Sequence, residues 1–281
     1  MSGFVAEFIS VRVTPTTVWL FLSLSDGEIT GWGEATLNNQ EDAVAACFKA
    51  LPARLSAADL GRLPFDTLPN AAVSSALLQA LADLLARREN VPVSQHLGGT
   101  LHTQIGLYAN INRRTKDRDP QSMAQNAGLA LAQGYEAIKI APFDEVQPTM
   151  SFREIAAATE LGLARIAAVR EMIGDRRLMV DCHWRFDPAG AEALIAAVSP
   201  FNLYWIECPI AETEEDIPSL VKLRGFANAA GIRLAGLETA IQRNGFAPYL
   251  AAGAYDVMMP DVKYCGGPRE MLAIAADLAR H

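Results

Sequence analysis

The sequence lacks any run of about 18 consecutive apolar residues, the minimum for a membrane-spanning helix. Its first residues, MSGFVAEFISVRV, have neither the basic start nor the cleavage site of a secretory signal, and they favour a β-strand. Its four cysteines include no CxxC pair, so neither a disulfide framework nor a zinc site is indicated. These absences predict a cytoplasmic protein with no membrane partner.

Positive charge is scarce as well. The 281 residues include 24 Lys and Arg against 32 Asp and Glu, for a formal net charge of −8. Nucleic-acid binding requires a positive surface, so this function class is excluded. The phosphate-binding patterns GxGxxG and GxxxxGK[ST] are also absent, and no nucleotide site is predicted. A hydrophobic content of 51% is typical of a folded globular protein.

The first hundred residues predict an α+β domain. Runs rich in β-branched and aromatic residues indicate an antiparallel meander of three strands, at residues 4–13, 17–24 and 28–34. Two stretches rich in Ala and Leu, the second with clear helical spacing, predict helices at residues 41–55 and 70–88. The pair Gly98 and Gly99, followed by Thr100, marks the expected end of this domain, which we place at residues 1–100.

From about residue 104 the pattern changes to short apolar runs that alternate with amphipathic helices. The runs are IGLYANIN, EAIKIA, RLMVD, NLYWIE, RLAGLE and DVMMPD. Such alternation predicts a parallel sheet, and without a phosphate-binding motif it favours a (β/α) TIM-type barrel. A complete barrel has eight strands in roughly 250 residues. We therefore expect an α/β protein in which residues 101–281 form an incomplete barrel domain with strands 1 to 6.

Three successive barrel strands end in an acid: Asp181, Glu207 and Glu238. Catalytic groups of such barrels lie at the carboxyl ends of the strands, and adjacent strands are only about 4.8 Å apart. Three neighbouring carboxylates repel one another unless a cation lies between them. Mg²⁺ fits such hard oxygen ligands. The alternative is that each acid merely caps the helix that follows it.

A histidine stands two residues after the first of these acids. If the strand continues through Asp181, Cys182 and His183, alternation places the acid and the histidine on the same side. His183 is then within reach of a molecule held by the metal. The alternative is an ordinary imidazole in a loop.

Taken together, these residues resemble the enolase superfamily, and within it the mandelate racemase and muconate lactonizing enzyme branch. The segments that carry the resemblance are GWGEA (31–35), VDCHWRFDP (180–188), YWIECPI (204–210), LAGLE (234–238) and MMPDVKYCGG (258–267). The resemblance implies a capping domain before the barrel, and Asp181, Glu207 and Glu238 as Mg²⁺ ligands. It also implies removal of the proton α to a carboxylate to give a metal-stabilised enediolate.

Two differences from the usual pattern of this branch indicate which of its subgroups the chain resembles. Its racemases and cycloisomerases usually have Lys-x-Lys at the second barrel strand, whereas this chain has Lys139, Ile140 and Ala141. Ala141 therefore replaces the lysine base, while Lys139 remains to contact the metal-bound carboxylate. Many members also have a long loop between the first two strands of the capping domain, whereas only residues 14–17 join them here.

The short connection and the Asp-x-His pair resemble acid-sugar dehydratases of the galactonate type. This resemblance implies that His183 is the general acid that expels the β-hydroxyl as water. Asp261 matches the aspartate that orients the base, a histidine after the seventh strand that we expect beyond residue 281. Family members usually form dimers or octamers, so a homo-oligomer is expected.

The sequence thus predicts a Mg²⁺-dependent lyase of carbohydrate acid catabolism, acting on a small sugar acid. The first alternative is an isomerase or cycloisomerase of a sugar lactone or anhydro-sugar acid, which would release no water. The second is a truncated family member that keeps the fold without catalysis.

Overall fold

The computed structural model describes residues 3–15, 17–99 and 102–281. The chain divides into two compact units. The first comprises Met1–Thr103, Glu238–Ala247 and Pro260–His281; the second comprises Gln104–Leu237 and Pro248–Met259. The boundary expected between residues 100 and 101 lies outside the described residues, so domains 1–100 and 101–281 stay a prediction.

The first unit contains an antiparallel sheet, in the order β1-β2-β3, together with several helices. Its elements are β1 (Val5–Thr14), β2 (Thr17–Ser25), β3 (Thr30–Glu34), α1 (Glu41–Lys49), α2 (Ala57–Leu60), α3 (Leu68–Glu89), α4 (Val93–His96) and α10 (Gly267–Leu278). The sheet confirms the predicted meander. The short connection predicted between its first two strands includes residue 16, which lies outside the described residues.

The predicted helix over residues 41–55 is too long, because α1 ends at Lys49. Pro52 follows shortly after this end. Proline has no backbone N–H to donate, and it disfavours the helical conformation of the residue before it, so the helix cannot run on to residue 55.

The core of the first unit lies between β2 and α3. Leu20, Leu22 and Leu24 alternate along β2 and are all buried. Strand β3 also contacts α3, through Gly31 and Gly33. A Cβ atom on either glycine would overlap a backbone carbonyl oxygen of α3, so the close approach of strand and helix requires glycine there. This packing gives the GWGEA segment a structural reason.

Helix α3 is by length and composition apolar enough to cross a membrane. However, 56% of its most apolar 18-residue window is buried inside the protein. It packs against β2, β3, α1, α4 and α10. We therefore interpret α3 as the core helix of the first unit.

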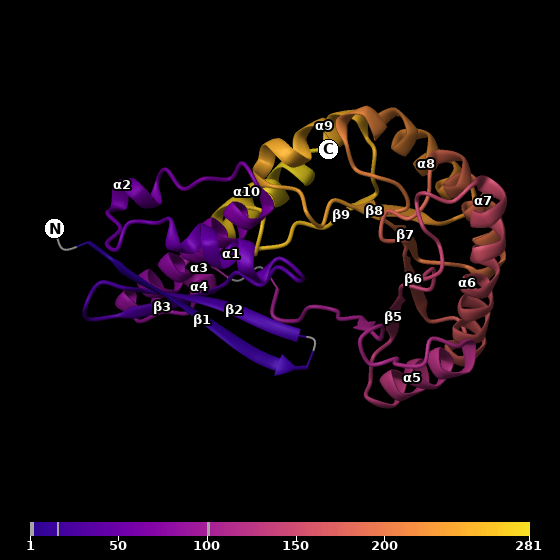
Figure 1. The fold of residues 1–281 in the computed structure, drawn as a ribbon, viewed down its shortest axis with the longest axis horizontal. Coiled ribbons are helices and arrows are strands. Elements are labelled where there is room, and N and C mark those ends of the chain that lie inside the picture. The colour runs from indigo at the N-terminus through magenta and orange to yellow at the C-terminus, as the bar shows by residue number, and fades with distance from the viewer. Residues whose placement is uncertain (1–2, 16, 100–101) are drawn as a thin grey trace. The chain divides into compact units, whose positions relative to one another are not determined.

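The second unit is built around a parallel sheet whose strands follow one another in chain order (Figure 1). The strands are β4 (Ala109–Asn110), β5 (Ala137–Ile140), β6 (Arg177–Asp181), β7 (Trp205–Glu207), β8 (Arg233–Gly236) and β9 (Val257–Met258). The helices are α5 (Pro120–Ala132), α6 (Phe152–Ile173), α7 (Pro188–Val198), η1 (Ser199–Phe201), η2 (Glu214–Asp216) and α8 (Ile217–Ala229). Helix α9 (Gln242–Ala252) begins in the first unit and ends in the second.

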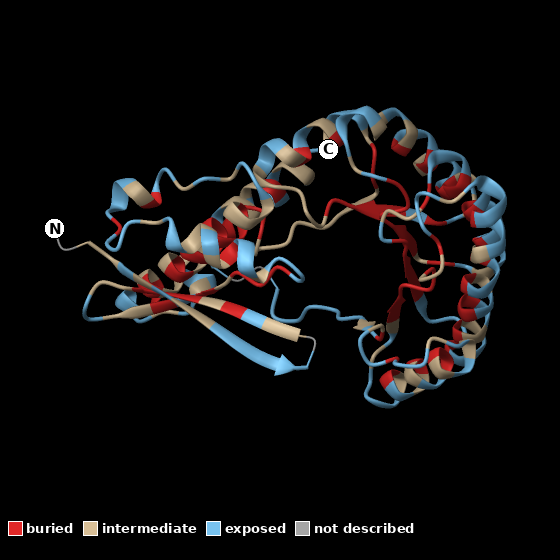
Figure 2. Cartoon of the chain, in the orientation of Figure 1, coloured by how far each residue is buried: buried red, intermediate tan, exposed pale blue. Residues whose placement is uncertain are grey.

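Helices α5 to α8 lie along one side of this sheet, and the strands themselves are largely buried (Figures 1 and 2). On the other side of the strands, Met179, Trp205 and Ala235 form an apolar cluster. Alternating helices and parallel strands in this order confirm the predicted α/β fold and correspond to part of a TIM barrel. The carboxyl ends of the strands therefore meet at one edge of the sheet.

Candidate metal and acid–base site

Three charged side chains come together where β5, β6 and β7 lie side by side. Lys139 belongs to β5, Asp181 ends β6 and Glu207 ends β7. Asp181 and Glu207 are direct partners in the strand register, so their side chains project from neighbouring positions. All three residues are buried, with exposed fractions of 5%, 3% and 0% respectively. The fold therefore brings Asp181 and Glu207, two of the three predicted metal ligands, together with Lys139.

The Lys139 ammonium group lies between the two carboxylates. It forms an ion pair with Glu207 Oε1, and its Nζ is 3.4 Å from Asp181 Oδ2. The second oxygen of Glu207 accepts a 3.0 Å hydrogen bond from Trp205 Nε1. Burying charges is costly unless they are paired and hydrogen-bonded, and this arrangement meets both conditions. One ammonium against two carboxylates still leaves an excess of negative charge.

The electrostatic environment keeps Lys139 and Asp181 ionised. Burial alone would lower the pKa of Lys139, but the charges of Glu207 and Asp181 outweigh it and raise the pKa above its ordinary value. Burial would likewise raise the pKa of Asp181, but the hydrogen bond from His183 and the charge of Lys139 together lower it. The pair is therefore charged at neutral pH.

His183 lies in a turn immediately after β6, with a positive φ of 48°. Its backbone N–H donates to Asp181 Oδ1 at 3.0 Å, and its Nε2 is 3.1 Å from Asp181 Oδ2. The expected proximity to Asp181 therefore results from a turn and not from alternation along a strand. With 43% of its side chain exposed, the imidazole contacts Asp181 and is also open to solvent.

The two other predicted acids belong to the first unit. Glu238 follows Leu237 directly after the end of β8. Asp261 Oδ1 accepts a 2.9 Å hydrogen bond from the backbone N–H of Lys263, whose Nζ is 3.5 Å from Asp261 Oδ2. Across residues 3–15, 17–99 and 102–281, no group of three His, Cys, Asp or Glu side chains converges on a metal-sized point. The three-ligand set stays a prediction.

The second unit nonetheless has the chemistry that Mg²⁺ requires. Asp181 and Glu207 offer hard carboxylate oxygens on adjacent strands, and their shared negative charge exceeds that of the single lysine. Mg²⁺ takes one or two carboxylates and completes its coordination with water or substrate oxygens. The residues present therefore fit a Mg²⁺ ion.

Ala141, which is expected from the sequence to replace a lysine base, directly follows the end of β5. It is 4% exposed, and its backbone N–H donates to Asn112 Oδ1 at 2.7 Å. A methyl group has no proton to exchange near pH 7. Ala141 itself therefore cannot act as a base.

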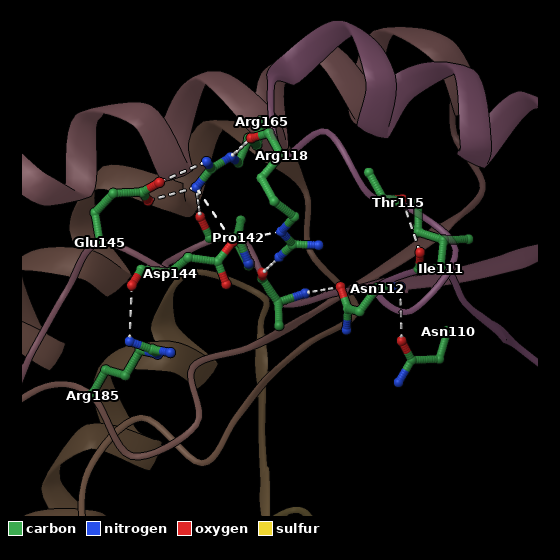
Figure 3. Close-up of polar contacts among 11 residues, drawn as sticks. Asn110, Ile111, Asn112, Thr115, Arg118, Pro142, Asp144, Glu145, Arg165 and Arg185 are labelled. Carbon is green, nitrogen blue, oxygen red and sulfur yellow. Dashed lines mark hydrogen bonds and ion pairs between the residues drawn. The ribbon is translucent and has the colours of Figure 1, made fainter. Parts of the chain in front are cut away.

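The loop that follows β5 is held by arginines from three other segments (Figure 3). Arg165 of α6 donates to both carboxylate oxygens of Glu145, at 2.6 and 2.7 Å. Arg118 Nε donates to Asp144 Oδ2 at 2.5 Å, and Arg185 donates to the Asp144 carbonyl oxygen at 3.1 Å. Bidentate and charge-assisted contacts of this kind are strong and directional. They fix the loop beside the strand that carries Lys139.

Sequence reasoning missed Trp205 and Arg165. Trp205 precedes Glu207 by two residues on β7, and the alternation of side chains along a strand could have placed both on one face. Arg165 lies in the middle of α6 and is 1% exposed. Nothing in the helical pattern distinguishes it from a solvent-facing arginine.

Comparisons with known proteins agree with this architecture. The sequence profile of the family described as enolase C-terminal domain-like matches residues 122–281, more than half of the chain. A D-galactonate dehydratase of Xanthomonas euvesicatoria pv. vesicatoria is 30% identical over 273 residues, which are 92% of this chain and 68% of that protein. A D-gluconate dehydratase of Thermoproteus tenax is 33% identical over 211 residues, or 74% of this chain. That match covers only 40% of the Thermoproteus protein.

Solved structures show the same fold. A member of the enolase superfamily from Salmonella Typhimurium matches with a TM-score of 0.84 and 22% identity, over 99% of this chain and 78% of the other. A mandelate racemase/muconate lactonizing enzyme from Jannaschia sp. CCS1 matches with a TM-score of 0.80 and 22% identity, over 98% and 77% of the two chains.

Proposed function

This chain belongs to the enolase C-terminal domain-like family. On that premise we propose that it functions as a Mg²⁺-dependent dehydratase of a sugar acid. The observation that carries the proposal is the buried cluster of Lys139, Asp181 and Glu207, with His183 at its exposed side. The names of the gluconate and galactonate dehydratases support the substrate class. Since this chain spans only part of those relatives, the activity of the whole protein is part of the proposal.

In this proposal Asp181, Glu207 and Glu238 hold Mg²⁺. When bound, the ion supplies positive charge that attracts the substrate carboxylate and favours loss of the neighbouring proton. Lys139 adds a second positive charge beside the carboxylates and lowers the pKa of Asp181. Trp205 fixes the orientation of Glu207 through its indole N–H.

His183 is the proposed general acid. The base removes the proton from the carbon next to the carboxylate, and the electron pair left behind forms a carbon–carbon double bond as the β-hydroxyl departs. The imidazolium of His183 gives its proton to that hydroxyl, which leaves as water. The contact with Asp181 orients the ring for this transfer. Asp261 has the proposed role of orienting the base.

The experiment is an assay with Mg²⁺ and a panel of aldonic and aldaric acids, with products analysed by mass and as 2-keto-3-deoxy acids. We expect loss of one water from at least one acid, and loss of that activity in H183N but not in H102N, a control at an exposed histidine. Turnover unchanged in H183N would refute the acid role. A product of unchanged mass would support the isomerase instead, and no turnover with any acid would support a non-catalytic chain.

Two further expectations belong to this proposal. A small, soluble substrate is compatible with a cytoplasmic enzyme, and the family's usual assemblies point to a dimer or an octamer. Light scattering of the purified chain gives the mass of the assembly.

A further inference from the structure

The backbone is strained at the carboxyl ends of three neighbouring strands. Residues other than glycine rarely have positive φ, and where they do the surrounding structure must hold them there. In the second unit this conformation occurs at Asn202 (φ 48°) and, just after β6, β7 and β8, at His183 (φ 48°), Trp184 (φ 56°), Cys208 (φ 47°) and Leu237 (φ 69°). Each of the turns after these three strands adjoins one of the acids proposed to hold the metal.

One carboxylate, that of Glu212, links all three turns. Its Oε1 accepts hydrogen bonds of 2.7 Å from the backbone N–H of Leu237 and 2.7 Å from the hydroxyl of Tyr255. Its Oε2 accepts a 2.9 Å hydrogen bond from Trp184 Nε1. The Cys208 sulfur is 3.9 Å from Oε1. Thus Glu212, in the loop after β7, contacts the turn after β6 and the turn after β8. It also contacts Cys208, the first residue of its own loop.

The backbone next to the Glu212 carboxylate has a glycine, Gly236, which leaves room for it. A Cβ atom on Gly236 would overlap Glu212 Oε1 and lie 2.7 Å from the ring of Tyr255. The glycine at the end of β8 therefore leaves the space that the carboxylate and the ring occupy. Tyr255 is 6% exposed. Its burial, and to a lesser extent the charge of Glu212, raise the pKa of its hydroxyl, so the hydroxyl keeps its proton and can donate it in a hydrogen bond.

From these contacts we infer that Glu212 is a positioning residue that holds the turns after β6, β7 and β8, and with them the acids at these strand ends. The inference rests on the proposed function for the purpose of the site, whereas the linkage of the turns stands on the geometry alone. The hydrogen bonds to Glu212 come from Trp184, Leu237 and Tyr255, so it acts on the acids through the turns that adjoin them.

A carboxylate is suited to this role because it is purely an acceptor and can receive several hydrogen bonds at once. The variant E212Q has nearly the same shape but replaces one acceptor oxygen by an NH₂ group. This group faces either the Trp184 indole N–H or the Leu237 N–H, and in both cases two donors oppose each other. The matched control is E215Q, which changes an exposed glutamate three residues further along.

The test is amide hydrogen exchange of the full chain, read by mass spectrometry without metal, followed by Mg²⁺ titration. For E212Q we expect exchange to be roughly tenfold faster in segments 182–186, 208–212 and 236–238, as for the loss of one charge-assisted hydrogen bond. Exchange in β2 should stay unchanged. Mg²⁺ affinity should fall roughly 10- to 100-fold, in line with other residues that orient metal ligands. E215Q should match the wild type.

Two results would overturn the inference: exchange in the three segments as slow as in E215Q, or equal acceleration throughout the parallel sheet, which would mark general destabilisation. If E212Q does not fold, W184F removes one donor to the same carboxylate, and its exchange in the segments after β6 and β8 decides the question. If the wild type neither binds Mg²⁺ nor dehydrates any sugar acid, the proposed function fails, while the exchange data still decide whether Glu212 links the turns.

Discussion

The variant K139M tests whether the buried lysine compensates the two carboxylates. Methionine has a similar length but no charge, so Asp181 and Glu207 would remain buried without their ammonium partner. Breaking a buried ion pair by removing one partner costs about 3–5 kcal/mol, because an uncompensated charge is left in a low-dielectric environment. We expect the metal-free protein to lose stability by that amount.

For a chain of this size, 1 kcal/mol corresponds to a change in Tm of about 2–4 °C. In EDTA the Tm of K139M should therefore lie roughly 6–20 °C below that of the wild type. Mg²⁺ offers a replacement cation and should raise the Tm of K139M more than that of the wild type. Thermal unfolding, followed by circular dichroism with EDTA and then with Mg²⁺, measures both effects.

The matched control is K222M, because Lys222 pairs with Glu192 at 3.1 Å but its side chain is 65% exposed. Surface pairs contribute about 0–1 kcal/mol, so the Tm of K222M should be nearly that of the wild type. If the Tm of K139M in EDTA equals that of the wild type, the buried lysine does not compensate the carboxylates and our electrostatic account is wrong.

Three further changes test other parts of the structure. G33A places a methyl group against a carbonyl oxygen of α3 and should destabilise the chain by about 1–3 kcal/mol in urea unfolding. W205F removes the hydrogen bond to Glu207 and should weaken Mg²⁺ binding roughly tenfold in calorimetry. The hydrogen bond from Arg165 lowers the pKa of Glu145, so its stabilising effect is present above the unfolded-state pKa and lost as pH falls through the folded-state value. E145Q should flatten this small acid-side loss in a pH series of Tm values, small because Glu145 is 39% exposed.

Most of the fold could be predicted because its signals are local. Strand alternation and helical spacing identify β1, β2 and α3, the last predicted at 70–88 and observed at Leu68–Glu89. The main error, at the end of α1, arose because apolar spacing continues past the point at which Pro52 prevents a helix. The parallel order of the strands follows from the regular alternation of the two element types.

The site could be predicted only where the strand pattern reaches it. Asp181 and Glu207 end apolar runs, so the topology alone brings them together. Glu212 lies in a loop without periodicity, and its partners Leu237 and Tyr255 are 25 and 43 residues away in the chain. Contacts of that kind depend on backbone conformations that no residue spacing encodes.

The most direct test of the central claim is a calorimetric titration of the metal-free chain with Mg²⁺, for the wild type and for E207Q. Glu207 is fully buried beside Asp181 and Lys139, so glutamine at this position removes the negative charge of the ligand with little change in shape. Our account predicts one saturable Mg²⁺ site in the wild type and none in E207Q at the same concentrations. Equal binding by the two proteins, or no binding by the wild type, would contradict it.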